Sequence, residues 1–356
     1  MLCSPMPMSQ ARRASMRAFS LIIRRIASDL RWLGGQCQAQ RLSRSRSPCL
    51  ARSLPRLALS LVLLSLVALN PMALPAQAEI RVVDDHGEAL TLAAPAQRIV
   101  ALAPHLVEDA FAAGAGAQLV GVIAGSDYPA AARELPRVGS YRGIALEAVV
   151  SAQPDLVLAW GSGTPDGLVR QLLALGIPVY RSEPRRLADV AGNLRDIGLL
   201  SGHPAAGERA AARFERALLE SRQQLTPAPR VFYQLGQAPL TTLADDQIVT
   251  RVIRHCGGEP LFAQAPVLVP EIGWESLLLA RPQVILAAAK DDAWQAFWAG
   301  HTALPAVAAG TLYSLDPDAI SRPGPRLAQA ARQMCADLAD AAARLASSSP
   351  SEGQDQ

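Results

Sequence analysis

Two glutamates, Glu147 and Glu275, stand at matching positions of an internal repeat, and they are the clearest chemical signal in the 356-residue sequence. The run from Ile144 to Ala159 recurs 128 residues later, with Ile, Glu, Ala, Pro, Leu and Ala coinciding without a gap. Each copy predicts a short helix, a proline that stops the helix, and a buried strand. A carboxylate in the first turn is favoured by the helix dipole, so each glutamate could stabilise its own helix.

The sequence offers no set of residues for enzymatic chemistry. Gly161-Ser162-Gly163 lacks the pattern of a nucleophilic serine, and neither a phosphate-binding nor a dinucleotide-binding glycine pattern occurs. Acid pairs at 84–85 and 245–246 lie in turn contexts, where solvated aspartates are ordinary. No two histidines are four residues apart, so we expect no metal, no cofactor and no catalytic residue. The scattered histidines are His86, His105, His203, His255 and His301.

Cys256 and Cys335 are the two cysteines that lie beyond residue 78. An even pair indicates one disulfide if the protein is exported to an oxidising compartment. Two separate buried thiols are the alternative, and a metal site from two cysteines alone is a weaker one.

An export signal precedes these residues. Arg52 and Arg56 are followed by an uncharged, mostly apolar run, Leu57 to Leu69, which is too short for the roughly 20 residues of a membrane span. Ala76-Gln77-Ala78 has the A-x-A spacing that signal peptidase reads. We predict a leader at 1–78 whose signal peptide is cleaved near Ala78, and a periplasmic protein that starts at Glu79.

Composition supports a folded, exported protein. Hydrophobic residues make up 50% of the chain, which is enough for one large or two smaller cores and excludes a disordered chain. Residues 1–78 hold eleven arginines and one acid, so the rest of the chain keeps 23 basic and 30 acidic residues, a net charge of −7. We therefore expect no nucleic-acid partner, because the folded part lacks a basic surface.

Strands and helices must alternate to position these residues. Apolar runs alternate with helical patterns after a predicted hairpin from Arg81 to Leu92, which indicates parallel sheets with helices on both faces. The predicted strands are Arg98–Ala103, Leu119–Ile123, Leu156–Trp160, Ile177–Tyr180, Arg230–Leu235 and Val284–Ala289. The predicted helices are Val107–Ala113, Leu146–Ala152, Gly167–Leu175, Ile248–Cys256 and Pro325–Leu345.

A longer helical pattern, Pro204 to Leu225, interrupts the alternation and is stopped by Thr226-Pro227. Its roughly 33 Å could join two domains. With the repeat, it predicts an α/β fold of two Rossmann-like lobes, joined by one long rigid helix and binding a ligand in the cleft between them. The expected division is a leader at 1–78, an N-terminal lobe at 79–202, a linking helix at 203–227, a C-terminal lobe at 228–346 and a disordered tail at 347–356.

Several segments match one family in the same order. The segments RIVALAPH, EDAFAAGAG, VGSYRGIALEAVVSAQPDLVLAWGSG and CGGEPLF resemble the periplasmic solute-binding proteins of ABC importers for iron-siderophores, haem and vitamin B12. The resemblance covers nearly all of residues 80–345, within a binding domain at about 98–346. It is closest to the cobalamin-binding branch, through Ser126-Asp127-Tyr128-Pro129, Ala159-Trp160-Gly161 and the cysteine pair. It implies the class III periplasmic-binding-protein fold with little hinge motion.

The resemblance also implies a partner for the repeated glutamates. In the family, one surface glutamate per lobe docks into arginine pockets of an inner-membrane permease dimer, and Glu147 and Glu275 are the matching positions. Because both copies of the repeat carry the acid, we prefer docking to a purely helix-stabilising role.

The cobalamin branch lines its cleft with aromatic side chains, which suit the flat corrin ring. The resemblance implies that Tyr128, Tyr141 and Trp160 bind the ligand through aromatic rings. It implies that Asp318 and Arg322 bond the ligand's amides or nucleotide loop. Large aromatics of the branch are replaced here by Gly125, Leu235, Val269, Ala319 and Ile320.

The expected function is therefore the substrate-binding subunit of an ABC importer, a monomer that captures vitamin B12 (cobalamin) and is not an enzyme. A ferric siderophore or haem is the alternative ligand, which would require a basic cluster or an axial His or Tyr. Arg322 and Tyr141 keep that alternative open, whereas the single lysine, Lys290, weighs against a dense cationic pocket. An exported enzyme with a cleft active site is the distant third function.

Overall fold

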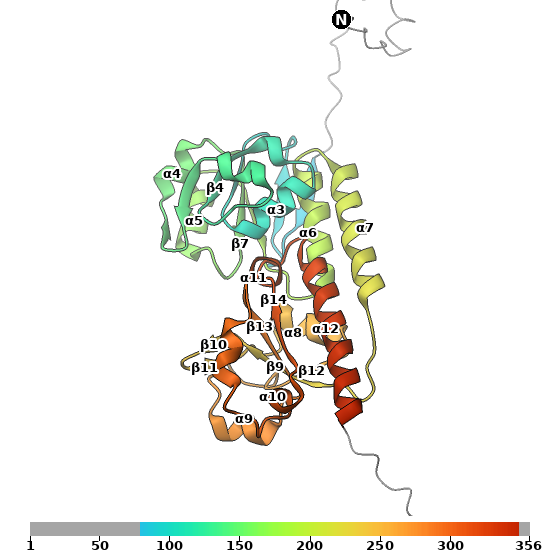
Figure 1. Cartoon of the computed structure of the whole chain (residues 1–356). Coiled ribbons are helices and arrows are strands. Elements are labelled where there is room, and N and C mark those ends of the chain that lie inside the picture. Colours follow the sequence, from blue (N-terminus) through green and yellow to red (C-terminus); the bar gives the residue numbers. More distant parts are fainter. Residues whose placement is uncertain (1–78, 349–356) are drawn as a thin grey trace, which may run out of the picture. The chain divides into compact units, whose positions relative to one another are not determined.

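The computed structural model describes residues 79–348, which belong to one compact unit, Gln77–Gln356 (Figure 1). The predicted leader and cleavage site, and residues 349–356 of the predicted tail, lie outside the described residues. Within the described part no helix is long and apolar enough to cross a bilayer.

The N-terminal half is built on a six-stranded sheet of order β6-β5-β4-β3-β7-β8, parallel except for the edge strand β6. The interior strands β3 and β7 are almost wholly apolar because both faces of the sheet are covered. A predicted hairpin precedes the sheet and is confirmed as β1 paired with β2. The strands are β1 Ile80–Val83, β2 Ala89–Leu92, β3 Ile99–Ala101, β4 Leu119–Ile123, β5 Arg137–Ser140, β6 Gly143–Ile144, β7 Leu156–Trp160 and β8 Val179–Ser182. The helices are α3 Pro104–Ala112, α4 Leu146–Ser151, α5 Asp166–Ala174 and α6 Leu187–Leu200, with 3-10 turns at Gly116–Gln118 and Ala130–Glu134.

The C-terminal half is built on a four-stranded parallel sheet of order β12-β9-β13-β14, with a small separate hairpin of β10 and β11. The strands are β9 Arg230–Gln234, β10 Gly236–Gln237, β11 Leu240–Thr241, β12 Glu259–Pro260, β13 Val284–Ala288 and β14 Leu312–Leu315. The helices are α8 Ile248–His255, α9 Trp274–Ala280, α10 Pro305–Ala309, α11 Pro317–Ile320 and α12 Leu327–Ser348, with a 3-10 turn at Ala293–Trp298. Two α/β halves with parallel sheets confirm the predicted fold class.

The internal repeat is a structural repeat. Its two copies form α4 followed by β7 and α9 followed by β13. Gln153 and Arg281, which occupy the same repeat position, both have φ of 49°, a left-handed conformation that is rare for residues with a Cβ. Each ends its helix directly before the matched proline, so the copies share a turn as well as a helix and a strand.

Hydrogen bonds to the residue after the matched proline repeat as well. Asp155 accepts the backbone N–H groups of Gln97 and Arg98, ahead of β3. Gln283, 128 residues later in the sequence, accepts the backbone N–H of Arg230 at the start of β9. Each repeat copy therefore fastens the first strand of its own sheet in the same way.

Helix α7, Pro204–Ser221, links the two halves and lies beside α6 and α12 (Figure 1). Its buried residues Ala211, Phe214 and Leu218 belong to the same apolar cluster as Leu194 of α6 and Val231 of β9. The linking helix is therefore packed into a core that continues into the C-terminal half, which favours a rigid connection.

The predicted linking helix is too long at its C-terminal end. Arg222 has an extended backbone, with φ −61° and ψ 133°, so the helix ends four residues before Leu225. The next residue, Gln223, donates from its side chain to the backbone carbonyls of Cys256 and Cys335. Leu225 packs against the core from an extended segment, so its apolar spacing was misread as helical.

Other elements also differ from those expected from the sequence. The sequence analysis does not predict α6 or β14, and it starts the strand at Val179–Ser182 two residues early. Helix α12 extends to Ser348, so the first two residues of the predicted disordered tail are helical. A disulfide joins Cys256 and Cys335, which confirms the predicted pair.

Candidate functional site

The predicted ligand residues follow the carboxyl ends of parallel strands. Trp160 is the last residue of β7, Tyr128 comes after β4, and Tyr141 directly follows β5. Asp318 and Arg322 follow β14, the last strand of the second sheet. The carboxyl ends of parallel strands lie at one edge of a sheet, where open α/β folds bind ligands.

The Trp160 indole is held from two directions and is 40% exposed. The His105 ring meets it edge to face, with ring centroids 5.9 Å apart. Gly163 lies so close that a Cβ there would come within 2.0 Å of Trp160 Cε3. The ring position therefore depends on a histidine and on a glycine that has no side chain.

His105 is fully buried on α3, and its Nε2 atom has no hydrogen-bond partner among the described residues. Burial, and secondarily the charge of Arg322, lowers the pKa of His105 to about 3. The imidazole is therefore neutral at physiological pH and serves as an uncharged wall beside Trp160.

Glu108 joins the two halves of the molecule. Its side chain is 1% exposed on α3 and accepts three hydrogen bonds from arginines between α11 and α12. Arg326 donates from Nε to Oε2 at 2.8 Å and from Nη2 to Oε1 at 2.6 Å, and Arg322 Nη1 donates to Oε1 at 3.1 Å. A buried carboxylate is stable only when paired in this way, so the contact fixes α3 against the start of α12.

Arg322 has two further carboxylate partners. Its Nη1 atom donates to Asp127 Oδ1 and its Nη2 atom to Asp318 Oδ1, both at 2.7 Å. The hydrogen bond from Arg322 lowers the pKa of Asp127, so this carboxylate is ionised at neutral pH. The predicted ligand residues Arg322 and Asp318 are thus brought together, and both terminal nitrogens of the guanidinium already donate to carboxylates.

Arg326 also holds an aromatic side chain. Its guanidinium lies 4.3 Å from the centroid of the Tyr128 ring, a cation–π contact, and Tyr128 is 48% exposed.

We call Glu108, Asp127, Asp318, Arg322 and Arg326 the carboxylate–arginine cluster. It contains three carboxylates and two guanidinium groups.

Asp109 lies next to Glu108 and is completely buried. Neither of its carboxyl oxygens has a hydrogen-bond partner within residues 79–348. Burial, and then the charges of Glu108 and Asp85, raise the pKa of Asp109 well above its ordinary value. An added Cβ at Gly324 would come within 3.3 Å of Asp109 Oδ1, so the protonated side chain faces the segment that carries the arginines.

Tyr141 stands apart from these contacts. Its side chain is 87% exposed, and its hydroxyl accepts a hydrogen bond from the neighbouring Arg142. Of the positions where the branch carries large aromatics, Leu235 and Val269 are exposed. Ala319 and Ile320 are buried in the C-terminal core, where they cannot line a surface site.

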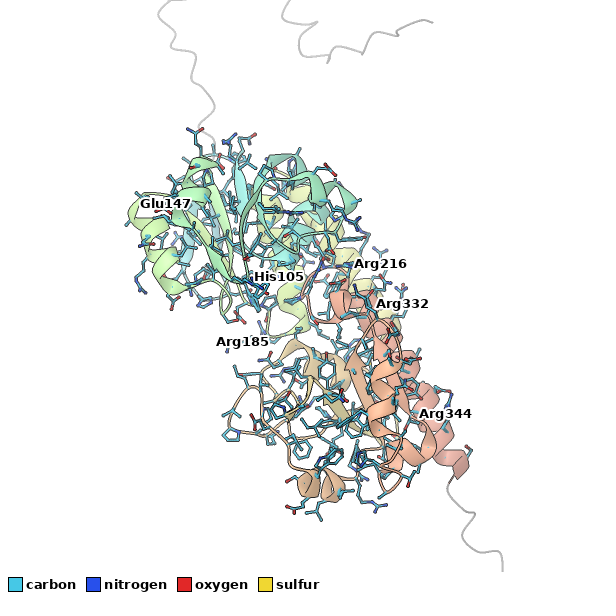
Figure 2. The ribbon with its side chains drawn as sticks, turned by 60° about the vertical axis from the view of Figure 1, so that its left-hand side comes forward. His105, Glu147, Arg185, Arg216, Arg332 and Arg344 are labelled. Carbon is cyan, nitrogen blue, oxygen red and sulfur yellow. A yellow bond between two sulfur atoms is a disulfide. The ribbon has the colours of Figure 1, made fainter. Side chains whose placement is uncertain are left out.

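The repeated glutamates are exposed in the first turns of α4 and α9. Neither has an ion pair among the described residues. Figure 2 shows Glu147 at the outer end of the N-terminal half, away from His105, which lies at the end turned toward the second sheet. The structure therefore separates Glu147 from His105, the residue that contacts the predicted ligand residue Trp160.

Two other observations limit what the molecule can bind. Within residues 79–348 there is no cluster of three or more His, Cys, Asp or Glu that could hold a metal ion. Cavities of about 680, 430 and 320 Å³ lie beside β12, beside the β1–β2 hairpin, and between α7 and α12. None of these three is lined by a predicted ligand residue.

Four residues of the site escaped the sequence analysis as individual candidates: His105, Glu108, Asp127 and Arg326. One signal was present. Glu108 and Asp109 are adjacent acids in an otherwise apolar helix, and such acids need a partner or a proton when the helix is buried.

Comparison with known proteins places the chain among binding proteins. A family model described as periplasmic binding protein matches residues 99–319. The vitamin B12-binding protein of Vibrio parahaemolyticus is 37% identical over 246 residues, covering 68% of this chain and 89% of the relative. The crystal structure of the periplasmic vitamin B12-binding protein BtuF of Vibrio cholerae has 36% identity and a TM-score of 0.65, covering 69% and 98% of the two chains. The periplasmic haem-binding protein RhuT from Roseiflexus, in apo form, has 26% identity and a TM-score of 0.61, covering 69% and 99%.

Proposed function

The chain belongs to the periplasmic binding protein family, and we propose that it captures vitamin B12 in the periplasm and delivers it to the permease of an ABC importer. Membership confirms the resemblance described from the sequence. It also confirms that the protein is not an enzyme, because the family consists of binding proteins. Vitamin B12 is then the transported ligand and not a cofactor.

The carboxylate–arginine cluster is the observation that carries the choice of ligand. Both arginines of this cluster, Arg322 and Arg326, are paired with carboxylates, and the three acids of the cluster outnumber them. A site for an anionic chelate would present free cations to it, because unpaired guanidinium groups bind carboxylates strongly. An amide-rich ligand without net charge, such as cyanocobalamin, suits this cluster better than haem or an anionic ferric siderophore.

Exposed aromatic side chains supply the complementary apolar contacts. Trp160 and Tyr128 are each partly exposed and each fixed by a neighbour, His105 or Arg326. Fixed rings lose little conformational entropy on binding, and their faces suit a flat macrocycle. We include Tyr141, Asp318 and Arg322 in the proposed site on the strength of their places after β5 and β14.

Transfer to the permease is assigned to Glu147 and Glu275. Both are exposed, unpaired within the described residues and located at equivalent points of the repeat. Two separated carboxylates can dock on two arginine pockets of a dimeric permease and thereby set the orientation of the carrier. We propose that the carrier is a monomer and that it docks from the periplasmic side.

Calorimetric titration of the purified protein tests the ligand. We expect saturable one-to-one binding of cyanocobalamin and much weaker binding of haemin and of a ferric siderophore. Haemin is the critical competitor, since haem-binding proteins share the fold. Tight binding of haemin or the siderophore without binding of cyanocobalamin would overturn the proposal.

A further inference from the structure

We propose that Glu108 determines the ligand preference of the site, because it takes up the charge of Arg322 and Arg326 and so keeps the site selective for uncharged over anionic ligands. The inference rests on the proposed function only in placing the ligand beside these arginines. No ligand contact is assigned to Glu108 itself, so it is a specificity-determining residue that acts through the arginines.

The geometry of Glu108 suits this role. Both of its oxygens are occupied, with Arg326 bound through two bonds and Arg322 through one, at 2.6 to 3.1 Å. The Glu108 side chain is 1% exposed, whereas those of Arg322 and Arg326 are 14% and 17% exposed. The arginines therefore reach the surface, and the acid that neutralises them lies behind them.

The three carboxylates of the cluster pair with different arginines. Asp127 and Asp318 pair with Arg322 alone. Glu108 is the one ion-pair partner of Arg326 within the described part of the chain. Without Glu108, Arg326 would keep the Tyr128 ring and the charges of Asp316 and Asp318, neither of which forms an ion pair with it, so no carboxylate would be hydrogen-bonded to its guanidinium.

A guanidinium without a hydrogen-bonded carboxylate changes the relative affinities for charged and uncharged ligands. It can bind a carboxylate through two parallel hydrogen bonds, so a ligand that carries carboxylates gains affinity. A ligand without charge gains less from it, because an amide oxygen accepts a weaker hydrogen bond from a guanidinium than a carboxylate does. If Glu108 served only to hold α3 against α12, its loss would instead weaken all ligands alike, whatever their charge.

The two roles can be separated with a matched pair of probes, haemin and haemin dimethyl ester, which differ in their carboxylates. The variant is Glu108→Gln, which keeps the side-chain shape and removes the charge. The control is Glu220→Gln, which makes the same charge change at an exposed position of α7. Affinities are measured by quenching of tryptophan fluorescence, and circular dichroism checks folding.

We expect Glu108→Gln to raise the ratio of haemin to ester affinity by about tenfold, as expected for one new charge-assisted pair. Glu220→Gln should leave the ratio unchanged. Adding Arg326→Gln to Glu108→Gln removes the freed cation and should return the ratio toward that of the wild type. An unchanged ratio in a folded Glu108→Gln protein would overturn the inference.

A second variant applies if Glu108→Gln does not fold. Asp127→Asn removes a carboxylate that is 49% exposed from Arg322, so the substitution spares the buried part of the cluster. We expect it to shift the ratio in the same direction by a smaller factor, and no shift would also overturn the inference. The comparison does not require cyanocobalamin, so a wild-type protein that fails to bind cyanocobalamin would refute the proposed function and leave this test intact.

Discussion

At the scale of single residues, each key side chain of the proposed site is held in position by a neighbouring residue. Trp160 is fixed by His105 and Gly163, Tyr128 by Arg326, and the arginines by a buried acid. Such support fixes the geometry of a binding site before the ligand arrives.

Gly163→Ala should displace the Trp160 ring. The new Cβ would lie 2.0 Å from Cε3, so the indole must move to make room. We expect cyanocobalamin affinity to fall about tenfold, close to the loss from Trp160→Ala, with a shift in tryptophan emission. Titration calorimetry and fluorescence measure both effects.

Gly167→Ala is the matched control, because a Cβ at Gly167 meets nothing within 4 Å. It should leave both affinity and emission as they are in the wild type. Equal affinities for Gly163→Ala and the wild type would show that the ring position does not matter for binding.

Asp109 makes the stability of the protein depend on pH. Its pKa in the folded state is raised above the ordinary value of 3.8, so the folded protein keeps a proton that the unfolded chain loses. The wild type is therefore most stable relative to Asp109→Asn below about pH 4. Its relative stability falls as the pH rises toward the pKa of the folded state, by up to about 1.4 kcal/mol per pH unit.

Urea unfolding of both proteins at several pH values between 4 and 8 measures this difference. As the pH rises, the free energy of unfolding of Asp109→Asn should increase relative to that of the wild type. A difference independent of pH would mean that Asp109 is ionised in the folded protein.

At the scale of elements, α4 and α9 present the same acid from the two copies of the repeat. The faces around the acids differ. Leu278 and Leu279 are 44% and 84% exposed on α9, whereas Val150 is 37% exposed on α4 and the residue after it is a serine. The two helices that we propose for docking therefore offer equal charge and unequal apolar surface.

Replacing both Glu147 and Glu275 by Ala should abolish most uptake and leave ligand affinity unchanged. Each lost carboxylate leaves a permease arginine without its partner, at a cost of about 2–5 kcal/mol per pair if the contact is well desolvated. Uptake of labelled vitamin B12 by cells and calorimetry of the purified protein measure the two properties separately.

A double Glu134→Ala, Glu220→Ala variant is the control, because both glutamates are exposed and have no ion pair in the described structure. It removes the same charge from other elements and should transport normally. Loss of ligand affinity in the Glu147, Glu275 variant would place these residues in the ligand site and refute the docking role.

At the scale of the whole molecule, two kinds of contact tie the two halves, while the disulfide fastens α8 to α12 within the C-terminal half. Helix α7 shares its core with the C-terminal half, and Glu108 pairs with Arg322 and Arg326. These contacts oppose a hinge motion between the halves.

Loss of the disulfide should lower the free energy of unfolding. Cys256 and Cys335 are 79 residues apart, for which loop entropy predicts a loss of about 4.5 kcal/mol. Urea unfolding with and without a reductant measures this loss. Thiol labelling of the denatured, unreduced exported protein should find no free thiol, and labelled cysteines would contradict the bridge.

The sequence alone determined the features that depend on local pattern. Continuous apolar runs and period-3.6 hydrophobicity, with proline and glycine at the ends, predicted most strands and helices, and the repeat predicted two equivalent halves. The repeat also singled out Glu147 and Glu275 as exposed acids of first helical turns, and the cysteine count indicated the disulfide. The end of α7 was missed, because Leu225 fits a helical period although the backbone is already extended at Arg222 and the helix ends before it.

Only the tertiary structure decided which charges meet. Glu108 and the arginines that bind it are 214 and 218 residues apart, and no hydrophobic period or capping pattern links such distant positions. The contact of His105 with Trp160 likewise depends on how α3 packs against the end of β7. Arg322 was expected to bond the ligand's amides or nucleotide loop, and the structure pairs it with acids of both halves, because burying Glu108 requires partners that only the folded chain brings to it.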